Sequence, residues 1–278
     1  NGPFCDWPDY RPVNEEDSPE LIQHLRHQYA AVLKLCDENL GKILDAMDSY
    51  DLWKDTMLIV NTDHGFLLSE HGQWAKCHCP FYGEVAHTPL LSGSRSRRQN
   101  VRTSQLVQTI DLPATLLEYF GLPLFPDMEG KPLRPVIEQD VPVREGGLFG
   151  IFGGQVCCTD GTWVYMRSPL PDNQPRYEYT LMVTRHGGRR AFINHDILKS
   201  MKLASPFSFT KGIPVLKLES RQQVSQAGYP TMLFCLESDP DEEHPLKNIA
   251  EERRMAALMK KMMIENDCPE EQFIRMGL

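Results

Sequence analysis

Residues 57–65 read Met-Leu-Ile-Val-Asn-Thr-Asp-His-Gly, and residues 70–76 read Glu-His-Gly-Gln-Trp-Ala-Lys. The apolar run 57–60 predicts a short buried strand, so Asp63 and His64 come where that strand ends. Open α/β sheets place their ligand sites beyond the ends of strands. We therefore expect Asp63 and His64 to lie at such a site.

The residue types in this stretch suit a metal ion and an anion. Asp63 and His64 offer an oxygen and a nitrogen donor, and Lys76 could hold an anion against the metal. The alternatives are a helix N-cap beside a surface histidine and, for Lys76, a solvated surface lysine. The preceding strand, the following Gly65 and the lysine together favour metal-assisted hydrolysis of a charged ester.

Five segments resemble the sulfatase and phosphonate monoester hydrolase branch of the alkaline phosphatase superfamily. They follow one another in family order nearly from end to end of the chain. The segments are Thr62–Gly65, Glu70–Lys76, Phe81–Leu90, Gln108–Leu117 and Leu233–Pro240. The resemblance implies an α/β sandwich of the alkaline phosphatase type and hydrolysis of a sulfate ester, with a small molecule or a glycan as the ester.

The resemblance also implies roles for individual residues. Asp63 and His64 would be metal ligands, and the histidine, where many sulfatases carry Asn, shifts the expected metal from calcium towards manganese or zinc. Lys76 would be catalytic and substrate-binding, because its charge would stabilise the non-bridging oxygens. His87 would be a catalytic residue on the leaving-group side, with a structural histidine as the rival interpretation. His71 would contact substrate, unless it only shapes its loop.

One family feature is missing from the sequence. Members carry a nucleophile in a Cys or Ser-x-Pro-x-Arg segment near the N-terminus, where the Cys or Ser becomes formylglycine. None of the eight cysteines has proline two positions later and arginine four positions later. We therefore expect a C-terminal part of a longer enzyme, inactive alone, whose missing N-terminal half supplies the nucleophile and further metal-binding acids.

Two other functions stay open at this point. A phosphonate monoester or phosphodiester hydrolase of the same superfamily is favoured by the Asp-His pair and the spacing to Lys76. A hypothesis of another class is a non-catalytic binding remnant. Metal titration and a substrate panel would separate the three hypotheses.

Composition narrows the class of protein. The 278 residues are 41% hydrophobic and 24% charged, which is typical of a soluble globular protein. A net charge of −9 argues against nucleic-acid or acidic-membrane partners. The cysteines at 77, 79, 157 and 158 are poorly spaced for disulfides, so we expect a reducing, cytoplasmic compartment. Oligomerisation stays open.

The chain divides into two predicted parts. Residues 1–147 would belong to the α/β catalytic domain, and residues 148–278 would form an antiparallel β subdomain with a terminal helix. We could assign no structure to residues 184–230. Other local signals predict a long helix from Ser18-Pro19 to about residue 49, a helix from Asp111 to a C-cap at Gly121, a hairpin turning at Asp160-Gly161, strands within 177–183 and 231–236, and a last helix over 249–263.

Overall fold

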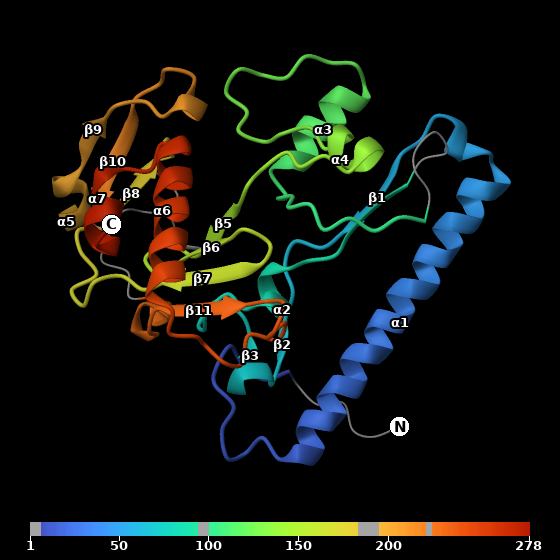
Figure 1. Cartoon of the computed structure of the whole chain (residues 1–278), viewed down its shortest axis with the longest axis horizontal. Coiled ribbons are helices and arrows are strands. Elements are labelled where there is room, and N and C mark those ends of the chain that lie inside the picture. The colour runs from blue at the N-terminus through green and yellow to red at the C-terminus, as the bar shows by residue number, and fades with distance from the viewer. Residues whose placement is uncertain (1–6, 94–99, 183–194, 221–223) are drawn as a thin grey trace.

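The computed structural model describes residues 7–93, 100–182, 195–220 and 224–278. Figure 1 shows the long helix α1 on one side of the molecule and an antiparallel sheet covered by helix α6 on the other. Within the described residues, none of the helices has the combination of length and apolar character that crossing a membrane requires.

Helix α1 (Pro19–Ser49) has the predicted boundaries. Ser18 caps it, because its hydroxyl accepts a hydrogen bond from the N–H of Leu21 at 3.2 Å, and proline occupies the first turn. A short 3₁₀ turn, η1 (Leu52–Lys54), follows. Only Leu25 and Met47 are buried among the described residues of α1, so most of its apolar stripe has no protein cover here.

Strand β1 (Leu58–Asn61) pairs antiparallel with β4 (Leu90–Gly93), in a register that sets Leu58 opposite Gly93. Strand β4 begins directly after Pro89, as expected for a residue that cannot donate to a ladder. The predicted burial of residues 57–60 is wrong for this structure. They are half-buried, because β4 is the one partner of β1 among the described strands.

Short elements connect this ribbon to the rest of the chain. Strands β2 (Leu67–Leu68) and β3 (Trp74–Ala75) pair with each other, and η2 (Glu70–Gly72) joins them. Helix α2 (Gly83–Ala86) leads to β4, and α3 (Asp111–Tyr119) and α4 (Arg134–Gln139) follow it. Gly121 has a φ of +67°, which confirms the predicted glycine at the end of α3.

The C-terminal half contains a four-stranded antiparallel sheet in the order β11-β7-β6-β5. These strands are β5 (Gly147–Gly150), β6 (Val156–Thr159), β7 (Trp163–Arg167) and β11 (Met232–Cys235). The predicted Asp160-Gly161 turn joins β6 to β7, and Gly161 has a φ of +92°. Helix α6 (Ile249–Glu265) packs its methionines against this sheet, and α7 (Glu270–Met276) follows.

A second, three-stranded antiparallel sheet has the order β8-β10-β9. Its strands are β8 (Tyr177–Thr180), β9 (Lys202–Ala204) and β10 (Val215–Glu219). The region that the sequence left unassigned thus contains two strands, with α5 (His195–Ser200), η4 (Ser208–Thr210) and η5 (Ser225–Gly228). Its residues 184–194 and 221–223 lie outside the described part of the chain.

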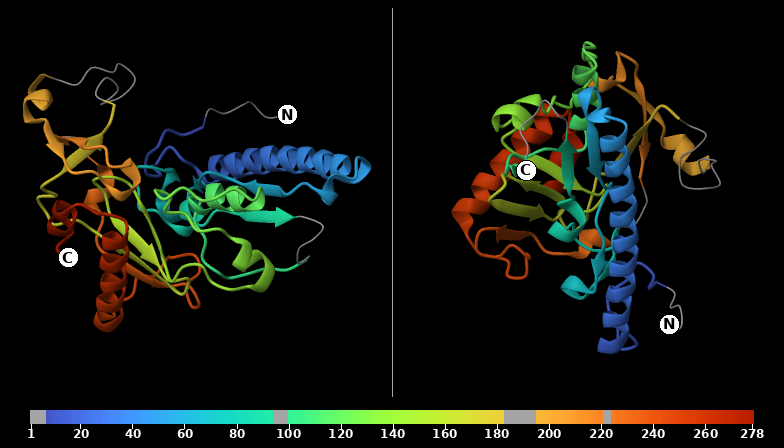
Figure 2. Two further views of the ribbon diagram at one scale, coloured as in Figure 1. Left: turned by 90° about the horizontal axis from the view of Figure 1, so that it is seen from above. Right: turned by 90° about the vertical axis from the view of Figure 1, so that its right-hand side faces the viewer.

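One hydrophobic cluster joins the two predicted parts. Leu67, Tyr82 and Val85 from the first part pack with Val164 and Phe234 from the second. The boundary at residue 147 stays a prediction. From a second direction, Figure 2 shows α1 and the β1–β4 ribbon projecting together, away from the C-terminal sheet. The seven cysteines in the described residues all carry free thiols.

Candidate functional site

The turn after β1 holds Asp63 through local hydrogen bonds. The Oδ1 atom of Asp63 accepts from the backbone N–H of His64 at 2.9 Å and from the hydroxyl of Thr62 at 3.3 Å. Partial desolvation alone would raise the pKa of Asp63. These hydrogen bonds and the neighbouring imidazole outweigh it and lower that pKa. The Asp63 side chain is 81% exposed, so the carboxylate is accessible to a ligand.

The imidazole of His64 is oriented by the backbone. Its Nδ1 atom lies 2.9 Å from the carbonyl of Gly65, and a carbonyl only accepts, so this geometry assigns the proton to Nδ1. The lone pair is then on Nε2, which lies 3.2 Å from Oδ2 of Asp63. Histidines that bind metals are commonly fixed in this way by a backbone carbonyl behind the ring.

Lys76 completes a group of three neighbouring side chains. It directly follows β3, whose Trp74 and Ala75 are fully buried, and its ammonium donates to Nε2 of His64. Asp63, His64 and Lys76 are therefore together at the end of β1, as the sequence predicted. Their roles as metal ligands and as an anion contact stay predictions.

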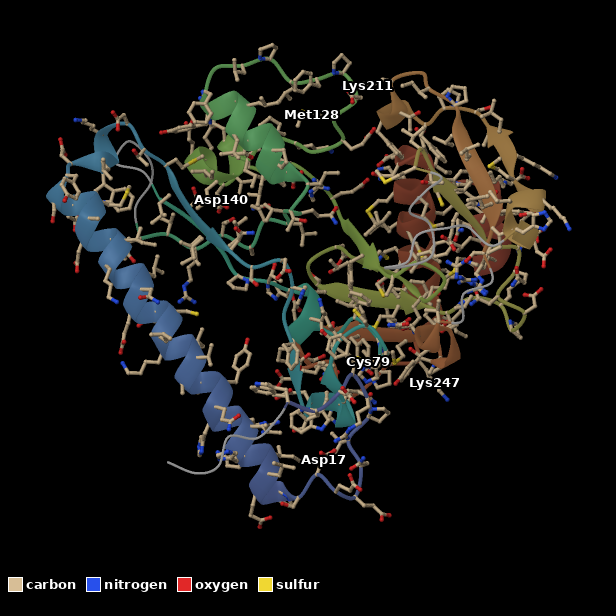
Figure 3. All side chains as sticks on the ribbon, turned by 180° about the vertical axis from the view of Figure 1, so that it is seen from behind. Asp17, Cys79, Met128, Asp140, Lys211 and Lys247 are labelled. Carbon is tan, nitrogen blue, oxygen red and sulfur yellow. The ribbon has the colours of Figure 1, made fainter. Side chains whose placement is uncertain are left out.

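Asp17 positions the strand that precedes Lys76. Its carboxylate pairs with Arg11 at 2.6 Å and accepts from the indole N–H of Trp74 at 3.1 Å. The Arg11 guanidinium holds the pKa of Asp17 well below its usual range. Figure 3 shows Asp17 near the start of α1. The N-terminal segment thus fixes β3, a contact across 57 residues.

Gly65 explains why the turn lies close to α2. The N–H of Gly65 donates to the carbonyl of Val85 at 2.9 Å. A Cβ atom at position 65 would lie only 1.7 Å from the carbonyl oxygen of Glu84, so no other residue fits without moving the backbone. Helix α2 is therefore the support behind Asp63 and His64.

His71 contacts this support rather than the open side of the site. Its ring stacks on Tyr82 at 3.6 Å between centroids, and its Nε2 lies 3.1 Å from Oε1 of Glu84. Burial alone would lower the pKa of His71, but the carboxylate of Glu84 outweighs it and raises the pKa. The side chain is 8% exposed. Substrate contact by His71 stays a prediction, and this geometry gives it a structural partner.

His87 lies at the C-terminal end of α2 and is exposed. Its backbone N–H donates to the carbonyl of Gly83 at 2.8 Å, which leaves the ring to be placed by its own rotamer. The residue follows Val85, the hydrogen-bond partner of Gly65, by two positions, so it directly follows the supporting helix. Its predicted catalytic role is untested by this arrangement.

Glu242 is a buried residue of the site that the sequence did not reveal. It comes from the loop after β11, and its Oε2 accepts from the N–H of Gly83, the first residue of α2, at 2.8 Å. Burial, with the nearby charge of Glu84, raises the pKa of Glu242 to about 7. No local pattern identifies this residue, because its partner lies 159 positions away.

The donor set of Asp63 and His64 fits a divalent metal, as one carboxylate oxygen and one imidazole nitrogen stand side by side. Within the described ranges there is no group of three or more His, Cys, Asp or Glu side chains that could hold a metal ion. Further ligands, or water, would have to complete such a site.

Comparison with known proteins finds relatives for the N-terminal part of the chain, which includes this site. The sequence model of the sulfatase family, described as Sulfatase, matches residues 4–122. The chain is 33% identical to arylsulfatase K of Homo sapiens over 115 residues, 41% of this chain and 21% of that protein. It is 29% identical to an N-acetylglucosamine-6-O-sulfatase of Bacteroides thetaiotaomicron over 119 residues, 42% of this chain and 21% of that one. The chain thus spans about a fifth of these relatives.

Solved structures extend the likeness over most of the chain. A putative sulfatase from Bacteroides thetaiotaomicron superposes with a TM-score of 0.61 at 15% identity, covering 96% of this chain and 53% of that chain. A phosphonate monoester hydrolase from Silicibacter pomeroyi superposes with a TM-score of 0.61 at 16% identity, covering 90% of this chain and 42% of that chain. At such identities the likeness shows the fold, which is the α/β fold of these hydrolases.

Proposed function

We propose that this chain belongs to the sulfatase family and supplies part of the active site of a metal-dependent sulfuric ester hydrolase. The observation that carries the proposal is the contact of Asp63, His64 and Lys76 at the end of β1. A carboxylate, an oriented imidazole and an ammonium in contact are suited to hold a cation together with an anionic ester.

In this proposal Asp63 and His64 hold one divalent cation, either calcium or, given the imidazole, manganese or zinc. When bound, the metal would neutralise charge on the ester oxygens. Lys76 now donates to the Nε2 lone pair of His64 that a metal would use. Its flexible stem lets the ammonium turn from His64 to an oxygen of the ester.

The remaining chemistry needs a nucleophile and an acid. The nucleophile, a formylglycine, would come from a Cys or Ser-x-Pro-x-Arg segment outside these 278 residues, so we expect the chain alone to be inactive. His87, exposed at the end of the supporting helix, would protonate the leaving group. Lys76 would stabilise charge on the non-bridging oxygens as it forms.

The proposed substrate is a sulfate ester on a sugar or another small molecule. Sugar sulfate is favoured because one relative is an N-acetylglucosamine-6-O-sulfatase. A second candidate is hydrolysis of phosphonate monoesters, favoured by the Asp-His pair and by the superposition on a phosphonate monoester hydrolase. Aryl sulfate and aryl phosphonate assayed with a polypeptide that includes the nucleophile segment would decide between them. If the aryl phosphonate is hydrolysed faster than the aryl sulfate, the sulfatase hypothesis is rejected.

The exposed apolar face of α1 is evidence that another part of the same enzyme packs on this helix. Several large apolar side chains of this helix are exposed, and the solved relatives are about twice as long as the aligned part of this chain. These side chains are Tyr29, Val32, Leu33, Leu35, Ile43 and Leu44. We propose that the nucleophile-bearing part of the sulfatase fold packs on them.

Metal binding by the chain as it stands tests the site without needing turnover. We expect Mn²⁺ titrated by calorimetry to bind the parent roughly tenfold or more tightly than the Asp63→Ala variant, because a charged ligand is lost. Asp172→Ala, which removes another exposed carboxylate, is the matched control and should bind like the parent. Equal Mn²⁺ binding by the parent and Asp63→Ala would reject the site and favour the binding remnant.

A further inference from the structure

Arg176, just before β8, has two buried guanidinium nitrogens without a hydrogen-bond partner. The residue is 7% exposed, and its Nε and Nη1 atoms are buried and unpaired. Its backbone is well held, since its N–H donates to Oε1 of Gln174 at 3.1 Å and its carbonyl accepts from Ser220 at 3.0 Å. The lack of partners therefore belongs to the side chain alone, in a segment fixed at both backbone atoms.

A second buried arginine lies beside it. Arg275 of α7 is 2% exposed, and its Nη1 donates to the carbonyl of Gly154 at 3.0 Å and to Oδ1 of Asn173 at 3.1 Å. Both acceptors are neutral. Among the described residues no carboxylate oxygen lies within 4.0 Å of either guanidinium. Two buried positive charges therefore lie near each other, and no carboxylate of the described residues is within salt-bridge distance of either.

The glycine pair 153–154 brings the two arginines together. A Cβ atom on Gly153, whose φ is +78°, would lie 3.0 Å from Nη1 of Arg176, while the carbonyl of Gly154 accepts from Arg275. Burial and then the positive charge of Arg176 lower the pKa of Arg275 to about 10. Gly153 therefore leaves room beside the Arg176 guanidinium that a side chain at this position would take up.

Such an arrangement is unfavourable unless something compensates for it. A guanidinium stays protonated in proteins, and a buried charge without a partner costs several kcal/mol. Water could accept the free N–H groups, but it would not neutralise two neighbouring cations. The buried Oγ of Ser220, in the loop bonded to Arg176, also lacks a partner. An anion with several oxygen atoms would neutralise the positive charge and accept hydrogen bonds from the unpaired N–H groups.

We propose that Arg176, Arg275 and the Gly153–Gly154 turn form a buried binding site for a small oxyanion of the sulfate or phosphate type. Planar guanidinium groups match the spacing of oxygens in such ions. The ion could be free in solution or be an anionic group carried on a sugar. This site goes beyond the proposed hydrolase and does not depend on Asp63, His64 or a metal.

Gln226 connects the oxyanion site to the Lys76 loop. Gln226, which is 1% exposed, donates from its side-chain amide to the carbonyl of Cys77, next to Lys76. A Cβ atom on Gly154 would lie 2.8 Å from Cβ of Gln226. Because the two sites are neighbours, the experiment must separate an ion at Arg176 from one at Lys76.

Sulfate binding to the chain as it stands is the test. Thermal unfolding and calorimetry would be measured with sodium sulfate, against sodium chloride at the same ionic strength. We expect saturable binding of one sulfate and a higher unfolding temperature in sulfate, because a ligand of the folded state stabilises it. Arg176→Met should lose both effects. In chloride it should unfold at the parent temperature or above, since an unpaired buried charge has been removed.

Three further variants interpret the result. Arg254→Met removes a partly exposed arginine that already pairs with Asp160, and it should respond to sulfate like the parent. Lys76→Met should also keep the sulfate response. If Lys76→Met loses this response while Arg176→Met keeps it, the ion binds at the proposed active site and the proposed oxyanion site is wrong. If Arg176→Met does not fold, Arg176→Lys should fold and bind sulfate roughly tenfold more weakly, since the fork of donors is lost.

Two outcomes would overturn the site. One is a parent that shows no saturable response to sulfate, phosphate or glucosamine 6-sulfate beyond that to chloride. The other is a response in Arg176→Met equal to that of the parent. A response to glucosamine 6-sulfate alone, abolished by Arg176→Met, would support the site with a sugar-borne group as its ligand. A response to the inorganic ions would support a free ion.

Discussion

Two regions of the molecule use similar apolar patterns with opposite results. The N-terminal arm, defined here as α1, β1 and β4, keeps Val32, Leu33 and Leu91 at 59 to 60% exposure. The sheet–helix unit, defined as β5, β6, β7, β11 and α6, buries Met255 and Met259 completely. Periodicity thus specifies which face of a helix is apolar, while burial requires a surface to pack on.

The largest expected effect lies in the sheet–helix unit. Met259→Ala should lower the free energy of unfolding by about 2–5 kcal/mol, because it leaves a cavity in a cluster that includes Tyr165 and Leu233. Urea unfolding followed by circular dichroism measures it. Ala257→Gly on the same helix is a control for helix propensity, expected to cost about 1 kcal/mol. A cost for Met259→Ala no greater than for this control would show that the α6 interface contributes little.

The next effect lies at Glu242, in the loop that follows β11 of the sheet–helix unit and contacts α2. The folded protein raises the pKa of Glu242 from its ordinary 4.5 to about 7. The unfolded chain therefore ionises first, and stability is lost as the pH rises between these values and stays constant above them. Glu242→Gln removes this loss, so it should stabilise the protein above pH 7 by up to about 3 kcal/mol and have little effect below pH 4.5.

Urea unfolding at several pH values measures the difference between Glu242→Gln and the parent. The glutamine can still accept from the N–H of Gly83, so the contact to α2 is kept. Glu243→Gln, an exposed neighbour, should leave the pH profile unchanged. A Glu242→Gln variant that is less stable than the parent at pH 8 would show that the ionised carboxylate is needed to hold α2.

The two regions also show which features a sequence can specify. Ser18, Gly121 and the Asp160-Gly161 turn act through backbone atoms a few residues away, so their helix and hairpin boundaries were predictable. The proximity of Asp63, His64 and Lys76 was predictable because the segments 62–65 and 70–76 resemble a known motif in which these residues act together. The partners of His71 and Gly83 were not predictable. Glu84 contacts His71 and Glu242 contacts Gly83 only in the folded chain, and Glu242 is 159 positions away from its partner.

The smallest expected effect is on the exposed face of the N-terminal arm. Leu33→Lys should change the free energy of unfolding of this chain by less than about 0.5 kcal/mol, because Leu33 is 59% exposed and lysine suits a helix nearly as well. Urea unfolding would be compared with Leu25→Lys, which places a charge at a fully buried position of the same helix and should be strongly destabilising. In a longer polypeptide that covers α1, Leu33→Lys should instead cost several times more. Equal costs for Leu33→Lys and Leu25→Lys in the 278-residue chain would mean that both faces of α1 are already packed, and the proposed partner surface would have to be abandoned.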